Sequence, residues 1–329
     1  MGKFLNVMLG KRYFSMIPVG VFCLFVSCTT FTYPNMKTHD YKHAYLYEMG
    51  NLSGNTLIIG IEGSGWRSTL GRNWNGIWFA TSASSYYLNL LMQEHTVIIP
   101  EKWRRDPRTP SGINSGVYYE DLQLRLLYTI EGLIENYAES INLYLSSNAY
   151  ESIFLIGFSE GAIILPLLYD RIYEKEKIKG MIVYAGGGLS GYDVYTILNT
   201  AKITPKRYRE MYAYIIENHD KGIEAWSNSI GVDKYGTVLL WITSILEFRP
   251  FEYYEKINIP VLFLHGTRDY NVAVESTRYI QENLPEKPFE YIYYGMEHGP
   301  NPWLPNYYFL LSRIRNDIIN WINKIQIME

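Results

Sequence analysis

A serine between two glycines is the arrangement in this sequence that is most suited to covalent chemistry. The run Gly-Phe-Ser-Glu-Gly at residues 157–161 follows an apolar segment at 152–156 and precedes a helical pattern at 162–173. A G-x-S-x-G nucleophile elbow requires this strand–turn–helix context, because the sharp turn raises the serine hydroxyl above the strand end. The alternative is an ordinary turn whose serine caps the helix. The pattern predicts Ser159 as a nucleophile.

A serine nucleophile also needs a base and an acid that orients the base. An apolar run at residues 260–264 leads to Asp269, and a second run at 289–293 leads to His298. Both side chains therefore follow the carboxyl ends of predicted strands, on the sheet edge where open α/β sheets bind ligands. We expect His298 to accept the proton of Ser159, and Asp269 to hold the imidazole and stabilise its charge.

Acyl transfer further needs donors for the oxyanion. The apolar run at residues 56–61 leads to Glu-Gly-Ser-Gly-Trp at 62–66, a glycine-interrupted loop that can aim backbone N–H groups. One expected donor is the N–H of Glu160, directly after the serine, and the other is that of Ser64 or Gly65.

Other residues compete for these roles. His265 precedes Asp269 by four residues and is a second candidate base, and Asp193 is a second candidate acid. His39 and His43 have the i, i+4 spacing of a metal pair on a helix, but nothing nearby completes a site. No motif predicts a metal or a cofactor.

Three motifs in this order resemble the α/β-hydrolase superfamily over residues 43–327. Residues 157–161 resemble its elbow, 260–272 its acid-bearing strand and loop, and 297–299 its histidine loop. The resemblance implies Ser–His–Asp catalysis without a cofactor, and it makes His265 a buried structural residue. Relatives commonly carry His-Gly where this chain has Glu-Gly at 62–63, which leaves the second oxyanion donor open.

The rest of the chain alternates between strand-like and helical segments. Strands are expected at residues 56–61, 96–100, 152–156, 180–185, 260–264 and 289–293, and helices at 77–91, 118–145, 162–173, 275–282 and 307–325. This alternation predicts an α/β fold: a mainly parallel sheet with helices on both faces. Residues 187–257 carry helical patterns but no strand, and are expected to form a helical cap inserted before the acid-bearing strand.

The composition and net charge limit the classes of partner that we expect. The chain has 329 residues, of which 47% are hydrophobic, and its net charge is −3. Since no basic face emerges from this balance, nucleic acid is not an expected partner. The expected partners are a small ester or peptide substrate and a membrane.

The membrane expectation comes from the N-terminus. Lys3, Lys11 and Arg12 precede an apolar stretch at residues 16–26, which is typical of a secretory signal peptide. Cys28 follows this stretch as in a bacterial lipobox, and predicts a lipid-anchored protein of the cell envelope, outside the cytoplasm. The predicted organisation is a signal peptide at 1–27, a tether at 28–42 and a hydrolase domain at 43–329, with the cap at 187–257.

The expected reaction is carboxylic ester hydrolysis through an acyl-enzyme. A serine peptidase or amidase of the same fold is the alternative, and an aminopeptidase of this kind would need a carboxylate such as Glu62, Glu160 or Glu297 to hold the substrate amine. A catalytically dead, membrane-tethered binding protein is a further alternative, although it has no chemical need for all three of serine, aspartate and histidine.

Overall fold

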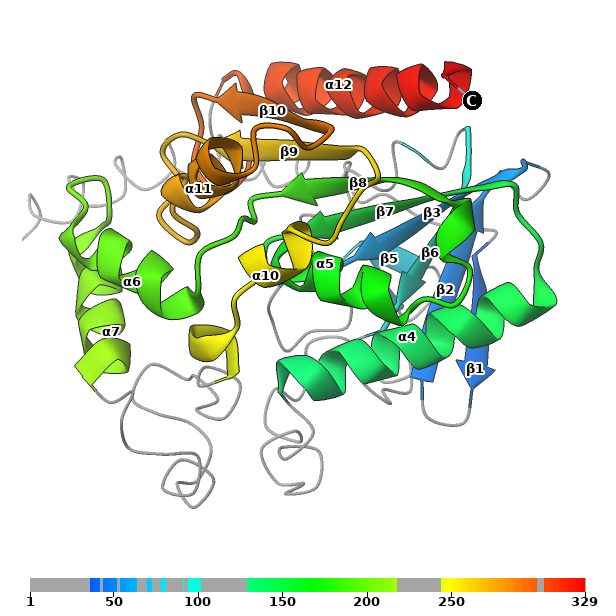
Figure 1. The fold of residues 1–329 in the computed structure, drawn as a ribbon, viewed down its shortest axis with the longest axis horizontal. Coiled ribbons are helices and arrows are strands. Elements are labelled where there is room, and N and C mark those ends of the chain that lie inside the picture. Colours follow the sequence, from blue (N-terminus) through cyan, green and yellow to red (C-terminus); the bar gives the residue numbers. More distant parts are fainter. Residues whose placement is uncertain are drawn as a thin grey trace, which may run out of the picture.

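The computed structural model describes residues 36–41, 44–51, 54–63, 70–72, 78–80, 91, 94–101, 129–217, 244–300 and 305–328. Within them, helices lie on both faces of one large sheet (Figure 1). The expected α/β architecture is confirmed. No helix in the described ranges is long and apolar enough to cross a lipid bilayer.

The large sheet has eight strands in the order β1-β2-β6-β3-β7-β8-β9-β10. Only β2 runs against its neighbours, and every pair from β6 to β10 is parallel. The strands are β1 Lys37–Tyr41, β2 Ala44–Gly50, β3 Thr56–Ile61, β6 Thr96–Pro100, β7 Ser152–Phe158, β8 Ile178–Tyr184, β9 Val261–Gly266 and β10 Phe289–Tyr294. A separate hairpin pairs β4 Leu70–Arg72 with β5 Trp78–Ala80.

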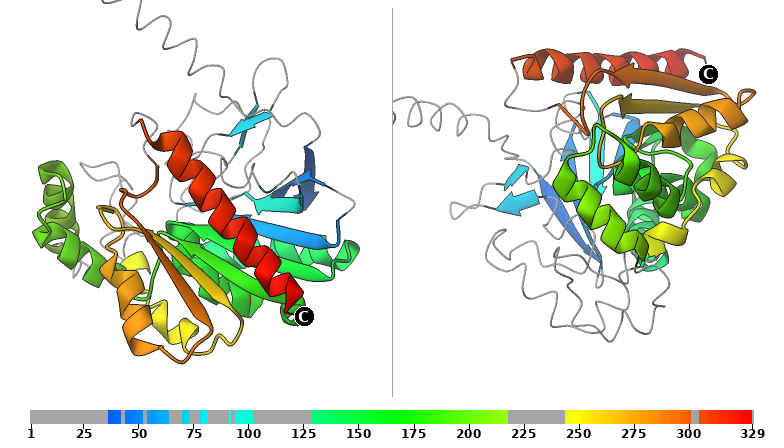
Figure 2. Two further views of the ribbon diagram at one scale, coloured as in Figure 1. Left: turned by 90° about the horizontal axis from the view of Figure 1, so that it is seen from above. Right: turned by 90° about the vertical axis from the view of Figure 1, so that its left-hand side faces the viewer.

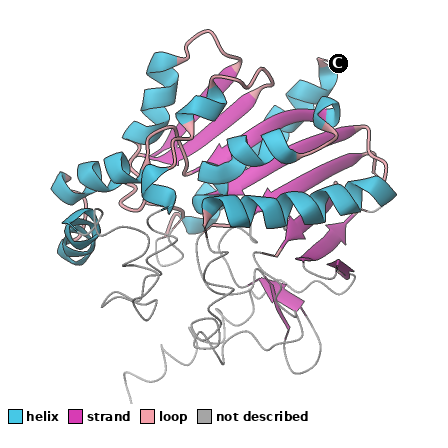
Figure 3. Cartoon of the chain, turned by 60° about the horizontal axis from the view of Figure 1, so that its bottom comes forward, coloured by secondary structure: helices cyan, strands magenta, loops and turns pink. Residues whose placement is uncertain are grey.

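The central strands are apolar along their whole length because both of their faces are covered. In β7, Ile153 and Leu155 enter the core on one face, whereas Phe154 and Ile156 enter the core on the other. This period of two is the alternation that a strand imposes on its side chains. Figure 3 shows the strands between the helices that cover them.

Four helices cover one face. They are α4 Ile130–Ser147, α5 Glu160–Arg171, α10 Phe251–Tyr254 and α11 Glu275–Asn283, and their apolar residues share one core with the strands. The N-terminus of α4 is capped by Thr129, whose hydroxyl accepts the N–H of Gly132 at 3.1 Å. A short 3₁₀ helix, η2 Lys175–Lys177, leads from α5 towards β8.

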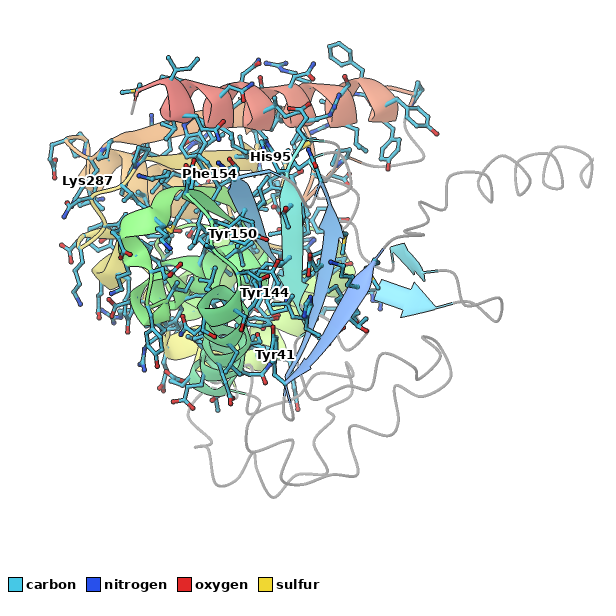
Figure 4. The ribbon with its side chains drawn as sticks, turned by 90° about the vertical axis from the view of Figure 1, so that its right-hand side faces the viewer. Tyr41, His95, Tyr144, Tyr150, Phe154 and Lys287 are labelled. Carbon is cyan, nitrogen blue, oxygen red and sulfur yellow. The ribbon has the colours of Figure 1, made fainter. Side chains whose placement is uncertain are left out.

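The opposite face is covered by α12, Tyr307–Ile327, which crosses the strands in the view from above (Figure 2). Its Trp321 meets the ring of Phe154 edge-on, with the ring centroids 6.2 Å apart. Figure 4 shows Phe154 on the α12 side of the sheet and Tyr144 of α4 on the other side. The two faces of the sheet are thus filled by different helices.

The remaining helices, α6 Gly191–Thr200 and α7 Lys206–Glu217, lie beyond the ends toward which β7 and β8 point (Figure 1). They form a hairpin around a small core that includes Val194, Leu198 and Ile215, and to which Ala273 of the acid loop also contributes. Residues 187–217 and 244–257 contain no strand, as expected, and Leu246 of the later part packs into the core of this hairpin. Tyr254 and Ile257 instead pack into the core beside α5, so residues 251–257 belong to the helical layer under the sheet.

Two expectations were wrong at the N-terminal side of the chain. Residues 37–41 were assigned to the tether but form the edge strand β1, which pairs antiparallel with β2. Residues 78–80 were assigned to a helix but form β5. An edge strand needs only backbone pairing on one side, so β1 carries no apolar pattern that would reveal it.

Gly180 is required where α12 crosses β8. A Cβ on Gly180 would lie 2.6 Å from Cη2 of Trp321, whose ring is buried in the core between α12 and the sheet. Gly180→Ala is therefore expected to lower the free energy of unfolding by about 1–3 kcal/mol, measured by urea denaturation. Gly295→Ala is the matched control, since a Cβ there meets nothing within 4 Å. Equal stability of the two variants would contradict this packing.

Candidate active site

The turn between β7 and α5 holds Ser159 in a strained conformation. Its φ is 55° and its ψ is −117°, a region that L-residues rarely occupy. The surroundings hold it there: the N–H of Ser159 donates to the carbonyl of Tyr184 at 2.9 Å, and its own carbonyl accepts from Ile163 at 3.0 Å. Strain of this kind costs about 1–3 kcal/mol and is concentrated at functional sites.

The hydroxyl of Ser159 is not used to cap α5. A capping serine has extended backbone angles and accepts a hydrogen bond from the first turn of its helix. Ser159 has neither feature, and its hydroxyl forms no hydrogen bond within the described part of the chain. The interpretation of residues 157–161 as an ordinary capped turn is therefore wrong.

The glycines of the elbow allow close backbone contact. A Cβ on Gly157 would lie 2.5 Å from the carbonyl oxygen of Gly161, and one on Gly161 would overlap the carbonyl oxygens of Ile61 and Glu62. The start of α5 therefore rests directly on the end of β3. This contact brings the loop that follows β3 to the serine.

Asp269 lies in the loop after β9 and is 1% exposed. Its Oδ1 accepts the N–H groups of Asn271 at 2.8 Å and Val272 at 3.0 Å, and its Oδ2 accepts a hydrogen bond from His298 Nδ1 at 2.7 Å. Burial by itself raises the pKa of Asp269. Hydrogen bonds from His265 and His298 outweigh burial, and they hold the pKa below its ordinary value of 3.8.

The bond to Asp269 defines the tautomer of His298. A carboxylate oxygen only accepts, so Nδ1 carries the hydrogen and Nε2 presents its lone pair in the neutral ring. The imidazole lies beside the elbow, with its centroid 5.2 Å from the ring of Phe158, the residue directly before Ser159. No hydrogen bond joins His298 to Ser159 among the described residues, a looseness that is common in unliganded active sites.

The expected oxyanion donors belong to the elbow and to the loop after β3. Glu160 is the first residue of α5, so its N–H lies at the start of the helix, directly after the nucleophile. A Cβ on Gly63 would lie 3.1 Å from Cβ of Ser159, so the loop after β3 passes against the nucleophile. Ser64 and Gly65, the expected second donors, lie outside the described residues.

The α6–α7 hairpin contacts this site through tyrosines. Tyr212 stacks on Tyr195 with the ring centroids 4.8 Å apart, and its hydroxyl donates to the carbonyl of Tyr270 at 2.8 Å. Tyr270 directly follows Asp269. Burial raises the pKa of Tyr195 to about 12, with a smaller contribution from the charge of Glu160.

Sequence reasoning missed Tyr212 and Phe158 as neighbours of the site. Tyr208 and Tyr212 are spaced i, i+4 on α7, and both contact Tyr270. This aromatic spacing was visible in the sequence, but the loop that it packs on was not. Phe158 was treated only as the variable position of the motif.

The competing candidates have other roles. Asp193 accepts a hydrogen bond from the hydroxyl of Ser190 at 2.6 Å at the start of α6, so it is not the acid that orients His298. His39 lies in β1 and forms a hydrogen bond with Glu48, whereas His43 lies outside the described residues.

Within the described ranges, no group of three metal-binding side chains occurs. His265 is fully buried in β9. Cys28 and residues 1–27, the expected signal peptide, also lie outside the described residues.

A family model described as serine hydrolase (FSH1) matches residues 131–300, a range that includes Ser159, Asp269 and His298. No curated protein sequence matches the chain.

Solved structures are similar to the chain at low identity. Est1E from Butyrivibrio proteoclasticus is 14% identical, with 88% of this chain and 99% of that one covered and a TM-score of 0.54. The esterase Pf2001 from Pyrococcus furiosus is also 14% identical, with 91% and 92% covered and a TM-score of 0.52. An acylaminoacyl peptidase from Pyrococcus horikoshii is 14% identical, with 88% of this chain but 41% of the peptidase covered and a TM-score of 0.51. Likeness at these identities concerns the fold.

Proposed function

The chain belongs to the serine hydrolase (FSH1) family and has the α/β-hydrolase fold, and from this premise we propose that it hydrolyses carboxylic esters through an acyl-enzyme on Ser159. The observation that carries the proposal is the conformation of Ser159: a strained residue whose hydroxyl does not cap the helix it precedes. The hydrogen bond between Asp269 and His298 supports it, because a base and its orienting acid are already joined.

In the first step, Ser159 Oγ attacks the carbonyl carbon of the ester while its proton passes to His298 Nε2. The carbonyl oxygen becomes an oxyanion, which the N–H of Glu160 and a donor from the loop after β3 stabilise. The ester C–O bond then breaks, the alcohol leaves with the proton held by His298, and the acyl group stays on Ser159.

In the second step, water replaces the alcohol. His298 takes a proton from the water as its oxygen attacks the acyl carbon, and the collapse of the intermediate returns that proton to Ser159 Oγ. Throughout both steps Asp269 remains ionised and stabilises the imidazolium, which is consistent with a pKa below its ordinary value.

The carboxylates near the elbow support an ester rather than a peptide with a free amine. Glu62 and Glu160 are 3% and 2% exposed, so neither presents a carboxylate to an incoming ammonium group. Glu297 raises the pKa of Tyr270 through its charge and a hydrogen bond, after the larger effect of burial, and is therefore already in contact with the acid loop. One of the similar structures, the esterase Pf2001, agrees with this preference.

Labelling with a tagged fluorophosphonate tests the nucleophile. The folded wild-type protein should react at Ser159, and Ser159→Ala should not react at all. Ser152→Ala, at the opposite end of β7, is the matched control and should label like the wild type.

His298→Ala should lower turnover by about 10⁴-fold or more, because triad members act as a unit. Undiminished labelling of Ser159→Ala would refute the mechanism.

The substrate class is tested by comparing two series of chromogenic compounds. p-Nitrophenyl esters of increasing acyl length should be hydrolysed with kcat/KM values well above those for aminoacyl-p-nitroanilides, and Ser159→Ala should abolish both activities. A preference for the anilides would identify the protein as a peptidase of the same mechanism instead.

The proposal extends to the location of the enzyme. The sheet begins at Lys37, a short distance along the sequence from Cys28, the expected lipidation site. In cells, the protein should fractionate with membranes, and Cys28→Ser should release it, since a multiply acylated cysteine supplies the anchor. Cys23→Ser is the control and should stay membrane-bound. Equal fractionation of the two variants would contradict a lipid on Cys28.

A further inference from the structure

We propose that His265 is a buried imidazolium that shares the carboxylate of Asp269 with His298, and that its charge opposes protonation of the catalytic base. This inference rests on the proposed function, because it concerns the electrostatics of the same Ser–His–Asp site. The argument depends on which atoms around the His265 ring are able to donate a hydrogen.

One ring nitrogen faces an oxygen whose hydrogen is already committed. His265 Nδ1 lies 2.7 Å from Oγ1 of Thr277, and the same hydroxyl donates to the carbonyl oxygen of Gly186 at 2.6 Å. A carbonyl cannot donate, so the hydroxyl hydrogen must point at Gly186. Thr277 can then only accept from His265, and Nδ1 carries a hydrogen.

The other ring nitrogen faces acceptors alone. His265 Nε2 lies 3.0 Å from the carbonyl oxygen of Val272 and 3.5 Å from Oδ2 of Asp269. Neither a carbonyl nor an ionised carboxylate supplies a hydrogen, so Nε2 must carry one too. A ring with hydrogens on both nitrogens is an imidazolium.

The surroundings provide the countercharge that a buried cation needs. His265 and the side chain of Asp269 have no exposed surface, and an unpaired charge in such a place would be very costly. Tyr293 of β10 pairs with His265 in register, but its hydroxyl donates to Gln281. Among the residues that the structure describes, the ionised group against His265 is Asp269, and His298 lies across that carboxylate.

This arrangement alters what Asp269 does for the base. Oδ2 is shared, because His298 Nδ1 approaches it at 2.7 Å and His265 Nε2 at 3.5 Å. The cation on His265 offsets part of the negative charge that would otherwise favour protonated His298. His265 thus acts as a positioning residue: it keeps the acid ionised, and it keeps the base free to accept the proton of Ser159.

The charge state can be observed directly. In ¹⁵N-histidine-labelled full-length protein near pH 8, one histidine should show two imidazolium-like ring nitrogens, and His265→Asn should remove exactly those signals. Thr277→Val, which takes away the acceptor of Nδ1, should give a neutral ring, whereas Thr277→Ser should keep the cation. One pyridine-like nitrogen on His265 in the wild type would overturn the proposal.

The catalytic consequence is read from the pH profile of kcat/KM for a p-nitrophenyl ester. Removing a nearby positive charge favours protonation of His298, so the acid limb of His265→Asn should move to higher pH by about one unit. Thr277→Val should move it in the same direction, and Thr277→Ser should leave it in place. A merely structural role would lower kcat without moving the midpoint, and that result would refute the electrostatic role.

These outcomes are separable from failure of the proposed function. If wild-type Ser159 does not react with fluorophosphonate, the hydrolase mechanism fails, yet the ¹⁵N signals still report whether His265 is charged. If Ser159 reacts and His265 proves neutral, the mechanism stands and this inference alone is wrong.

Discussion

The buried carboxylate of Asp269 is the group whose ionisation the rest of the site depends on. Water cannot solvate it, so its charge is held by the backbone N–H groups of Asn271 and Val272 and by two imidazoles. These donors come from β9 and from the loops that follow β9 and β10. Their convergence is a product of parallel pairing, because β9 and β10 end side by side and release their loops at the same edge.

The same constraint explains why so much of the site was predictable. Near-continuous apolar runs identify doubly covered strands, and in a parallel sheet the residues after each run must meet at one edge. The order of strands and helices from β6 onwards, and the meeting of Asp269 with His298, follow from this local information. The strain at Ser159 follows too, since glycines at 157 and 161 permit the close contacts of the turn with the start of α5 and of α5 with the end of β3.

What escaped prediction depends on contacts between distant segments. The polar strand β1 is stabilised by pairing with β2, by the ion pair of Lys37 with Glu48 and by the hydrogen bond between His39 and Glu48, none of which leaves an apolar signature. Residues 251–257 were expected to be part of the cap, because their aromatic residues are compatible both with a cap and with a helix packed under the sheet. Likewise, the hydrogens on His265 follow only from knowing that Thr277 also faces Gly186.

The hydrogen bond from Tyr212 to the carbonyl of Tyr270 has an implication for how this enzyme can change. It fastens the α6–α7 hairpin to the loop that carries Asp269, so the two are mechanically coupled. A substitution in the hairpin that admits a new substrate will also displace the acid loop unless Tyr212 keeps its place. Substrate range is then not independent of turnover: a change on the hairpin's outer surface leaves the acid loop in place, whereas a change in the tyrosines that face this loop displaces it.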